Sequence, residues 1–453
     1  MYIKNIKAVF REPSVRSIIV LIGGTSFAQL LGMLALPILT RLFTPEDFNV
    51  LAVFTSVVVL VSVAACLRFD IAVPLPDSEK EALGLLSLSM IFCLLTSFCV
   101  LLAVVVLNVF FVMEFTLGGI QKFLWMLPLV VLLMGFFSAL QFWATRVKEF
   151  QGIARARVSQ ALACVAVQLA LGVWGGDFGL VAGYCIGCFF GVLGLYKVAS
   201  RGGFKISPEM DFKYLCFVFK KYKRYPKYSV LESIANSAGI QASIILIAAL
   251  AAGPEAGFLM VAMKVLGIPM SLLGGAVGQV YLSEAPQAER VGTLAAYTER
   301  LTTRLMKVGV GPLVFLSIVA PTAFPYLFGG GWERAGELVL WMMPWFVFQF
   351  LASPVSMVMH VKKRQGSMLA LTLFGLFIRL GGVVVGSLNG GHVSELYALA
   401  SAVFYAICFW VFLTTAEVKG RDIVMLVFRS IHFPIAWALL GIALVFIWGR
   451  IIL

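Results

Sequence analysis

The sequence is dominated by a succession of long apolar runs that are separated by short polar segments. A run of about 20 apolar residues spans the hydrocarbon core of a bilayer as an α-helix, in which every backbone group finds a partner. Only 13% of the 453 residues are charged, whereas 61% are hydrophobic. The alternating pattern of membrane β-barrels is not present in these runs. The sequence therefore predicts an all-α polytopic membrane protein.

The apolar runs also predict approximate limits for the membrane helices. Twelve helices are expected at residues 17–39, 47–67, 82–108, 121–144, 154–174, 178–198, 226–251, 256–283, 305–328, 334–359, 366–388 and 392–416. A thirteenth is expected at residues 432–449. The outer loops between these helices are too short to hold a folded catalytic domain.

Basic residues predict which side of the membrane each loop occupies. If the N-terminus is cytoplasmic, only Arg41, Lys122, Arg334 and Arg450 fall in outer segments, as the positive-inside rule expects. The net charge of +13 is thus spread over alternate loops rather than gathered in one basic patch, so nucleic acid is not an expected partner. The first apolar run is long and has no small-residue cleavage site, so it is predicted to be a retained helix.

An internal repeat indicates two similar halves. The segment Trp125-Met126-Leu127-Pro128 recurs 216 residues later as Trp341-Met342-Met343-Pro344. Arg146-Val147-Lys148 recurs at the same offset as the basic cluster Lys362-Lys363-Arg364. Because six helices separate the two copies, both have the same orientation in the membrane.

The repeat predicts two six-helix lobes in parallel repeat around a central cavity. The expected parts are an N-terminal lobe at residues 1–198, a cytoplasmic basic linker at 199–225, a C-terminal lobe at 226–418 and an extra C-terminal helix within 419–453.

Two cations lie inside predicted helices. An ionised side chain near the middle of a membrane helix costs roughly 3 kcal/mol, so such residues usually face a wet cavity or a partner. Lys264 and Arg379 are expected about 12 and 14 Å below the outer ends of their helices, which puts them at one level. Two cations at one depth indicate an anion site.

Further polar residues suggest a cavity lining and a coupling group. Glu232 is the only carboxylate well inside a predicted helix, and Asn236 and Gln241 follow it. Thr25 and Gln29 lie in the first helix, the repeat partner of that helix. These four neutral residues are predicted to line the cavity. Glu232 is a candidate for ion coupling.

Charges at helix ends are open to two interpretations. Arg41, Arg68 and Asp70 either lie at the membrane interface as ordinary surface charges or contact the transported molecule. Asp70 is also a second candidate for ion coupling.

Motifs of enzymes and metal sites are not found. His360, His392 and His432 lie in separate loops, and no Gly-rich phosphate loop or Ser-His-Asp arrangement is present. Cys185 and Cys188 lie in a glycine-rich apolar run and are interpreted as helix-packing residues. The sequence therefore predicts a protein that is not an enzyme and that has no cofactor and no metal site.

Four segments resemble the Wzx-like, polysaccharide-type oligosaccharide flippases. They are LTRLFTPEDFNVLAVF at 39–54, LRFDIAVPLPDSEKEA at 67–82, KVLGIPMSLLGGAVGQVYLSEA at 264–285 and LFGGGWERAGELVLWMMPW at 327–345. These flippases share a superfamily with drug exporters of the MATE type and lipid II flippases. The resemblance covers residues 10–415.

The resemblance implies a cationic cavity that opens alternately to the two sides of a bacterial inner membrane. Its substrate would be an undecaprenyl-pyrophosphate-linked oligosaccharide for O-antigen, capsule or exopolysaccharide. Arg41, Arg68 and Lys264 fall on basic positions of the family's motifs. A polysaccharide polymerase and glycosyltransferases would be neighbouring partners, besides the membrane lipids. The alternatives on the same fold are a cation-coupled exporter of drugs or small molecules and a lipid II flippase.

Overall fold

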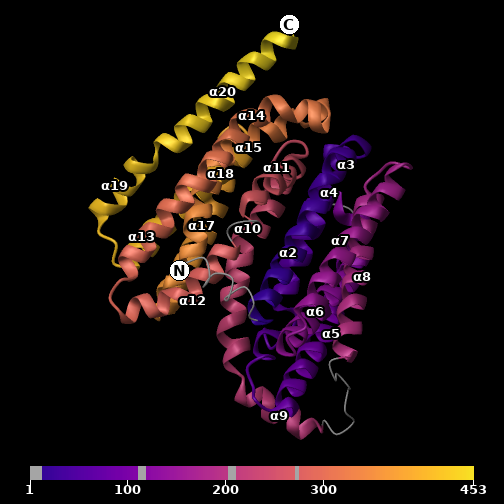
Figure 1. Ribbon diagram of the computed structural model, residues 1–453. Helices are drawn as coiled ribbons and strands as arrows, with labels where there is room; N and C mark the ends of the chain where they lie inside the picture. The colour runs from indigo at the N-terminus through magenta and orange to yellow at the C-terminus, as the bar shows by residue number, and fades with distance from the viewer. Residues whose placement is uncertain (1–12, 111–118, 202–210, 271–274, 453) are drawn as a thin grey trace. The chain divides into compact units, whose positions relative to one another are not determined.

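The computed structural model describes residues 13–110, 119–201, 211–270 and 275–452, and every regular element within these ranges is a helix (Figure 1). Eleven of the described helices are long and apolar enough to cross a membrane. The predicted all-α membrane class is therefore confirmed.

Two predicted spans are not among the eleven. The span 154–174 corresponds to α7 (Phe150–Gly172), which carries Arg155, Arg157 and three glutamines among its apolar residues. The span 256–283 is described as α11 (Glu255–Pro269) and α12 (Gly275–Arg290), and its residues 271–274 lie outside the described ranges.

The chain divides into two compact units. Unit 1 consists of the described residues of Met1–Phe43 and Val50–Ile245, and unit 2 of those of Thr44–Asn49 and Leu246–Leu453. Helix α4 (Pro45–Ala65) thus begins in unit 2, where Phe48 packs edge-on against Trp332 with ring centroids 5.0 Å apart. Helix α10 (Val230–Leu250) belongs mostly to unit 1 and ends in unit 2.

Unit 1 contains the helices that precede α11. Their bounds are α2 Pro13–Leu34, α3 Leu36–Leu42, α5 Glu79–Phe110, α6 Leu127–Arg146, α8 Phe178–Arg201 and α9 Phe212–Lys221, besides α4, α7 and α10. Helix α7 lies between α2 and α8 (Figure 1). The predicted first helix 17–39 is broken at Ala35, because Pro37 has no N–H to continue the bonding of α2.

Glycines set the close approach of α8 to α7. A Cβ on Gly183 would lie 2.4 Å from Gln168, and one on Gly187 would lie 2.8 Å from Cys164. Gly24 in α2 has the same role, because a Cβ there would lie 2.5 Å from that of Ala154. The small-residue spacing of the sixth predicted helix is therefore explained by packing against α7.

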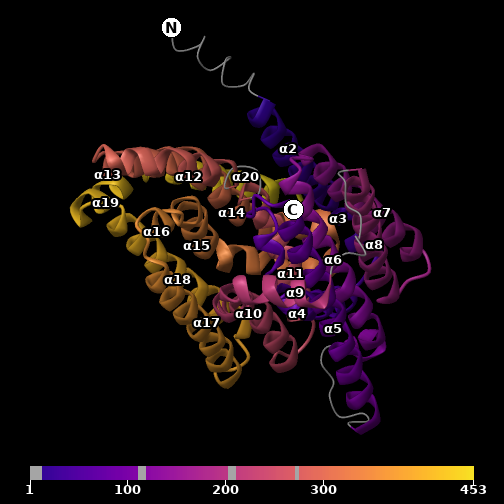
Figure 2. The same cartoon turned by 90° about the horizontal axis from the view of Figure 1, so that it is seen from below.

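Unit 2 contains the second set of spanning helices. Their bounds are α13 Leu294–Leu305, α14 Gly311–Phe328, α15 Glu333–Val355, α16 Val358–Val361, α17 Gln365–Leu388 and α18 Val393–Thr415. Helix α18 packs against both α15 and α17 (Figure 2). The predicted helix 305–328 begins earlier than expected, because α13 joins α14 through a π-helical turn at Met306–Val310.

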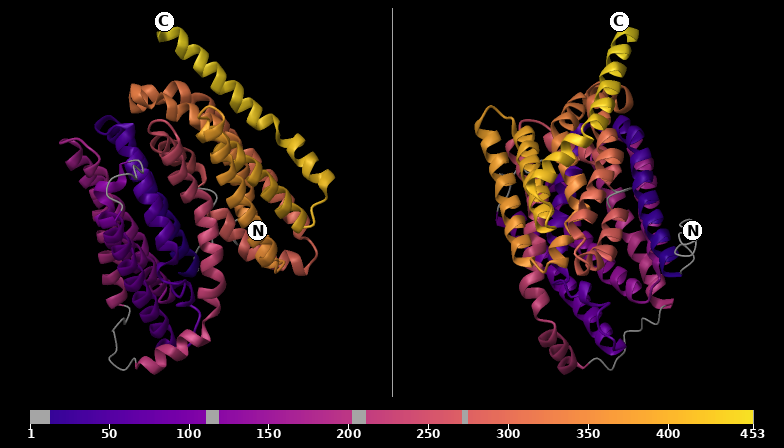
Figure 3. Two further views of the ribbon diagram at one scale, coloured as in Figure 1. Left: turned by 180° about the vertical axis from the view of Figure 1, so that it is seen from behind. Right: turned by 60° about the vertical axis from the view of Figure 1, so that its left-hand side comes forward.

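The C-terminal segment forms α19 (Gly420–Ser430) and α20 (His432–Ile452), and α20 lies along α14 (Figure 3). Trp437 of α20 occupies the space over Gly311, where a Cβ would come within 2.2 Å of the indole ring. Phe315 meets the same indole edge-on at 5.7 Å. The extra C-terminal helix expected within 419–453 is therefore present, and α14 supplies its packing surface.

One arginine joins the ends of three helices in unit 2. Arg334 Nε lies 2.9 Å from an oxygen of Glu255 in α11, and its Nη2 lies 2.5 Å from Glu395 in α18. The Ser394 hydroxyl donates to Glu255 at 2.6 Å. Glu395 and Glu255 lie in the first turns of their helices, where the helix dipole also favours a carboxylate. We call Arg334, Glu255 and Glu395 the arginine clamp.

A lysine has a similar position at the opposite helix ends. Lys362 Nζ lies 2.6 Å from Glu289, which belongs to α12, and 2.5 Å from Glu417, which follows α18. The hydrogen bond to Glu289 raises the pKa of Lys362 most, and the hydrogen bond to Glu417 raises it further. The second bond also lowers the pKa of Glu417. These three residues are the lysine clamp, which connects three turns of unit 2.

The two basic clusters of the sequence repeat have equivalent contacts. In unit 1, Arg146 donates to the carbonyl oxygen of Val73 at 3.4 Å. In unit 2, Lys362 pairs with Glu289. The two donors, Arg146 and Lys362, are 216 residues apart in the sequence, and so are the two acceptors, Val73 and Glu289. Each copy of the basic cluster therefore holds the turn after the second helix of its half.

We predict that Arg334→Gln lowers the melting temperature of the detergent-solubilised protein by several degrees. The substitution leaves Glu255 and Glu395, which are 13% and 8% exposed, without their cation, and removing one partner of such a pair costs about 1 to 3 kcal/mol. The control is Lys122→Gln, because Lys122 is 73% exposed and its ion pair with Asp177 is 3.5 Å long. Equal shifts in the two variants would contradict a structural role of the arginine clamp.

Candidate functional site

The predicted site residues occupy seven elements. Thr25 and Gln29 lie on α2, Arg41 on α3, Arg68 after α4, Asp70 in a 3₁₀ turn at Asp70–Ala72, Glu232, Asn236 and Gln241 on α10, Lys264 on α11, and Arg379 on α17. Only Lys264 and Arg379 belong to unit 2. The roles proposed for these residues stay predictions, whereas the structure shows the exposure of each residue.

Several of the predicted site residues are exposed polar side chains within helices. Among them are Gln29, Glu232, Asn236 and Lys264. Glu232 and Asn236 are four residues apart and therefore share one face of α10. An exposed polar or charged group at membrane depth is costly against lipid and is tolerated where it faces water. These positions are consistent with a wet lining, which the sequence also predicts.

Lys264 is isolated from the packed side of its own helix. Its neighbours Val261, Ala262, Val265 and Leu266 are all buried, and α11 packs on α14 and α15 through that side. Lys264 itself is exposed. The helix therefore presents one ammonium group on the side opposite its packed face.

Arg379 differs from Lys264 because it is only 3% exposed. Its guanidinium carbon lies 4.4 Å from the ring centroid of Phe404 and 5.2 Å from that of Tyr405, both on α18. The two cations, which the sequence places at one depth, thus do not share a surface. One is exposed on α11, and the other is enclosed between α17 and α18.

Arg68 and Asp70 lie in a tight turn at the end of α4. Leu67 and Arg68 both have left-handed backbone angles, with φ of 46° and 59°. Asp70 is 2% exposed, and one of its oxygens accepts a hydrogen bond from Ser138 at 2.5 Å, whereas the other has no partner within the described residues. A strained turn that holds a half-satisfied buried carboxylate is typical of functional sites.

Sequence reasoning missed Arg157 of α7. The residue lies inside the predicted helix 154–174, but it was not named as a site residue. In the structure, its Nη2 donates to Gln141 of α6 at 2.9 Å, and its Nε has no partner in the described part of the chain.

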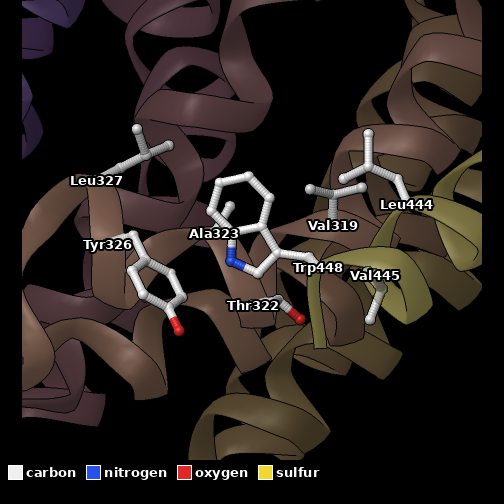
Figure 4. A pocket seen from close by; sticks show the side chains of 8 residues that line it. All are labelled: Val319, Thr322, Ala323, Tyr326, Leu327, Leu444, Val445 and Trp448. Atoms are coloured by element: carbon white, nitrogen blue, oxygen red, sulfur yellow. The ribbon is translucent and has the colours of Figure 1, made fainter. Parts of the chain in front are cut away.

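A cavity of about 150 Å³ lies apart from all the predicted site residues (Figure 4). It is lined by α14 and α20, and Tyr326 and Trp448 meet edge-on at its wall with centroids 5.7 Å apart. Its lining carries no charged side chain, so it has no group that would bind phosphate. Within the described residues, no cluster of His, Cys, Asp and Glu has the arrangement of a metal site.

Comparison with known proteins supports the fold and the family. The profile of the polysaccharide biosynthesis protein family matches residues 38–337. A solved lipid II flippase, MurJ, in an inward closed conformation has a TM-score of 0.73, with 12% identity over 96% of this chain and 98% of that one. A search of curated protein sequences gives no match.

A second group of similar structures consists of multidrug transporters. An inward-facing MATE family transporter of the MOP superfamily has a TM-score of 0.64, with 15% identity over 86% of this chain and 94% of that one. An outward-facing MATE family transporter has a TM-score of 0.53 with 13% identity, covering 90% of this chain and 96% of that one. At these identities the similarity defines the fold alone. The chain, by its profile match and its fold, belongs to the polysaccharide biosynthesis protein family and has the transporter fold shared by MurJ and the MATE proteins.

Proposed function

We propose that this protein is a flippase that carries undecaprenyl-pyrophosphate-linked oligosaccharide from the inner to the outer leaflet of a bacterial inner membrane by alternating access. It would not be an enzyme, because moving a lipid between leaflets forms and breaks no covalent bond. The family description and the fold shared with a lipid II flippase support this proposal. The observation that carries it is the exposed Lys264 on a helix that is otherwise apolar near that position.

The chemistry of the substrate fits such a lysine. A diphosphate in an apolar environment must exchange its water for other donors, and an ammonium group provides three of them without the bidentate grip of a guanidinium. We assign the diphosphate contact first to Lys264. Arg41, which is exposed, and Arg68, which is half-buried, are proposed as contacts near the helix ends. Arg379 is too enclosed to meet a diphosphate in the conformation described here.

The two alternatives on the same fold make different demands. An exporter of cationic drugs needs a dominant anionic group, whereas Lys264 would repel its substrates. Glu232, exposed on α10, is the feature that favours this alternative. A lipid II flippase would carry a related polyprenyl diphosphate, so the same lysine would serve it. The family match favours a polysaccharide precursor over lipid II.

Coupling to an ion is assigned to Glu232. Its side chain is exposed, so it can exchange protons or bind sodium, and Asn236 lies one turn away. Asp70 is the weaker candidate, because it is buried and already accepts a hydrogen bond from Ser138. A polysaccharide polymerase and glycosyltransferases are proposed as neighbours that consume and supply the substrate.

We predict that Lys264→Ala lowers the delivery of lipid-linked sugar to the outer leaflet by about tenfold or more, because a charge-assisted hydrogen bond contributes about 1.5 to 3 kcal/mol. Lys264→Arg should retain most of the delivery, since it keeps the charge. The measurement is the amount of polymer made by cells that contain each variant at equal membrane levels. The control is Lys307→Ala, another exposed lysine on a spanning helix of unit 2. Undiminished delivery by Lys264→Ala would contradict the assigned contact.

The coupling role of Glu232 predicts a second result. In Glu232→Gln cells, delivery should be low and should not fall further when a protonophore collapses the proton gradient, because the variant has lost the group that senses it. Wild-type delivery should fall on the same treatment. The matched control is Asn236→Ser on the same face of α10. A Glu232→Gln variant that responds to the protonophore as the wild type does would rule out this residue as the proton-coupling group.

A further inference from the structure

Arg379 is a buried cation without an ionic partner. Its side chain is 3% exposed, and within the described residues no carboxylate lies within ion-pair distance of it. Its Nε and Nη2 atoms are buried and have no hydrogen-bond acceptor there. A guanidinium removed from water loses several kcal/mol of hydration, and stacking on aromatic rings returns only about 1 to 2 kcal/mol. Some compensating group is therefore required.

The contacts of α17 with α18 show what lies opposite this arginine. A Cβ on Gly375 would lie 2.5 Å from Phe404, and one on Gly382 would lie 2.8 Å from Ala400. Arg379 lies between these glycines on the same helix, and its guanidinium lies over the rings of Phe404 and Tyr405 on α18. Tyr397 and Ser401 precede Tyr405 by two turns and one turn and therefore lie on the same face of α18.

The hydroxyl groups of this face are also unsatisfied. Tyr397 and Ser401 are both 0% exposed, and within the described structure neither hydroxyl has a hydrogen-bond partner outside this pair. Tyr397 lies within electrostatic range of Arg379. The interface thus holds three guanidinium N–H groups, on Nε and Nη2, and two hydroxyl groups that can donate hydrogen bonds. This set of donors around one positive charge suits an anion.

We propose that α17 and α18 enclose a binding site for a small monovalent anion of the size of chloride, held by Arg379, Tyr397 and Ser401. The burial of the site excludes a diphosphate head group, which is larger and carries more charge. A water molecule would satisfy some of the donors but would leave the guanidinium charge uncompensated. The bound anion fixes α17 to α18 and so stabilises unit 2. This inference does not depend on which lipid the protein carries.

The test compares the melting temperature of the purified full-length protein in sodium chloride and in sodium gluconate at equal ionic strength. Chloride should raise it by about 2 to 5 °C in a saturable way, as expected for a ligand that binds only the folded state. Arg379→Met should abolish the difference. Tyr397→Phe keeps the ring that packs on Trp345 and removes one donor, so it should raise the half-saturating chloride concentration about fivefold.

A control and a direct measurement keep the test decisive if Arg379→Met folds poorly. Arg157→Met removes a partly buried arginine whose Nη2 already has Gln141 as its acceptor, and should leave the chloride response unchanged. Crystals grown in bromide should show an anomalous peak between Arg379, Tyr397 and Ser401. An equal melting temperature in chloride and gluconate, a chloride response that persists in Arg379→Met, or a bromide derivative with no peak there would overturn the proposal.

Discussion

A charged side chain within apolar helices needs a compensating group, and the packing of both units depends on how each charge is compensated. In unit 2, Arg334 meets two glutamates from other helices, and Lys362 meets Glu289 and Glu417. In unit 1, Arg146 donates to carbonyl oxygens of the turn after α4, among them those of Val73 and Pro76. Each of these contacts joins segments that are distant in the sequence.

Under the proposed function, these contacts give unit 2 a mechanical role in transport. Alternating access by movement of lobes requires that each lobe keeps its internal packing while it moves. The arginine clamp joins α11, α15 and α18 at one set of helix ends, and the lysine clamp joins the turns that follow α12, α16 and α18. Because the two clamps join these helices at both ends, unit 2 has the contacts that rigid-body movement requires. Lys264 lies on α11, within this fastened set.

Much of the fold was predictable from the sequence because hydropathy and helix length are local properties. The repeat of basic clusters corresponded to equivalent turn contacts in the two units. The clamps were not predictable, because Arg334 is 79 residues from Glu255 and 61 from Glu395. The burial of Arg379 depends on Gly375, which admits the ring of Phe404, and no local pattern indicates which helix will pack there. Arg157 was missed because its hydrogen-bond acceptor, Gln141, lies on another helix.

The most direct test of the account uses vesicles that contain only the purified protein and a fluorescent polyprenyl-pyrophosphate oligosaccharide. An impermeant reagent added outside measures how much of the labelled lipid reaches the outer leaflet, and a cationic dye trapped inside identical vesicles measures drug export. The account predicts protein-dependent movement of the pyrophosphate-linked lipid and no export of the dye. Export of the dye without movement of the lipid would contradict it.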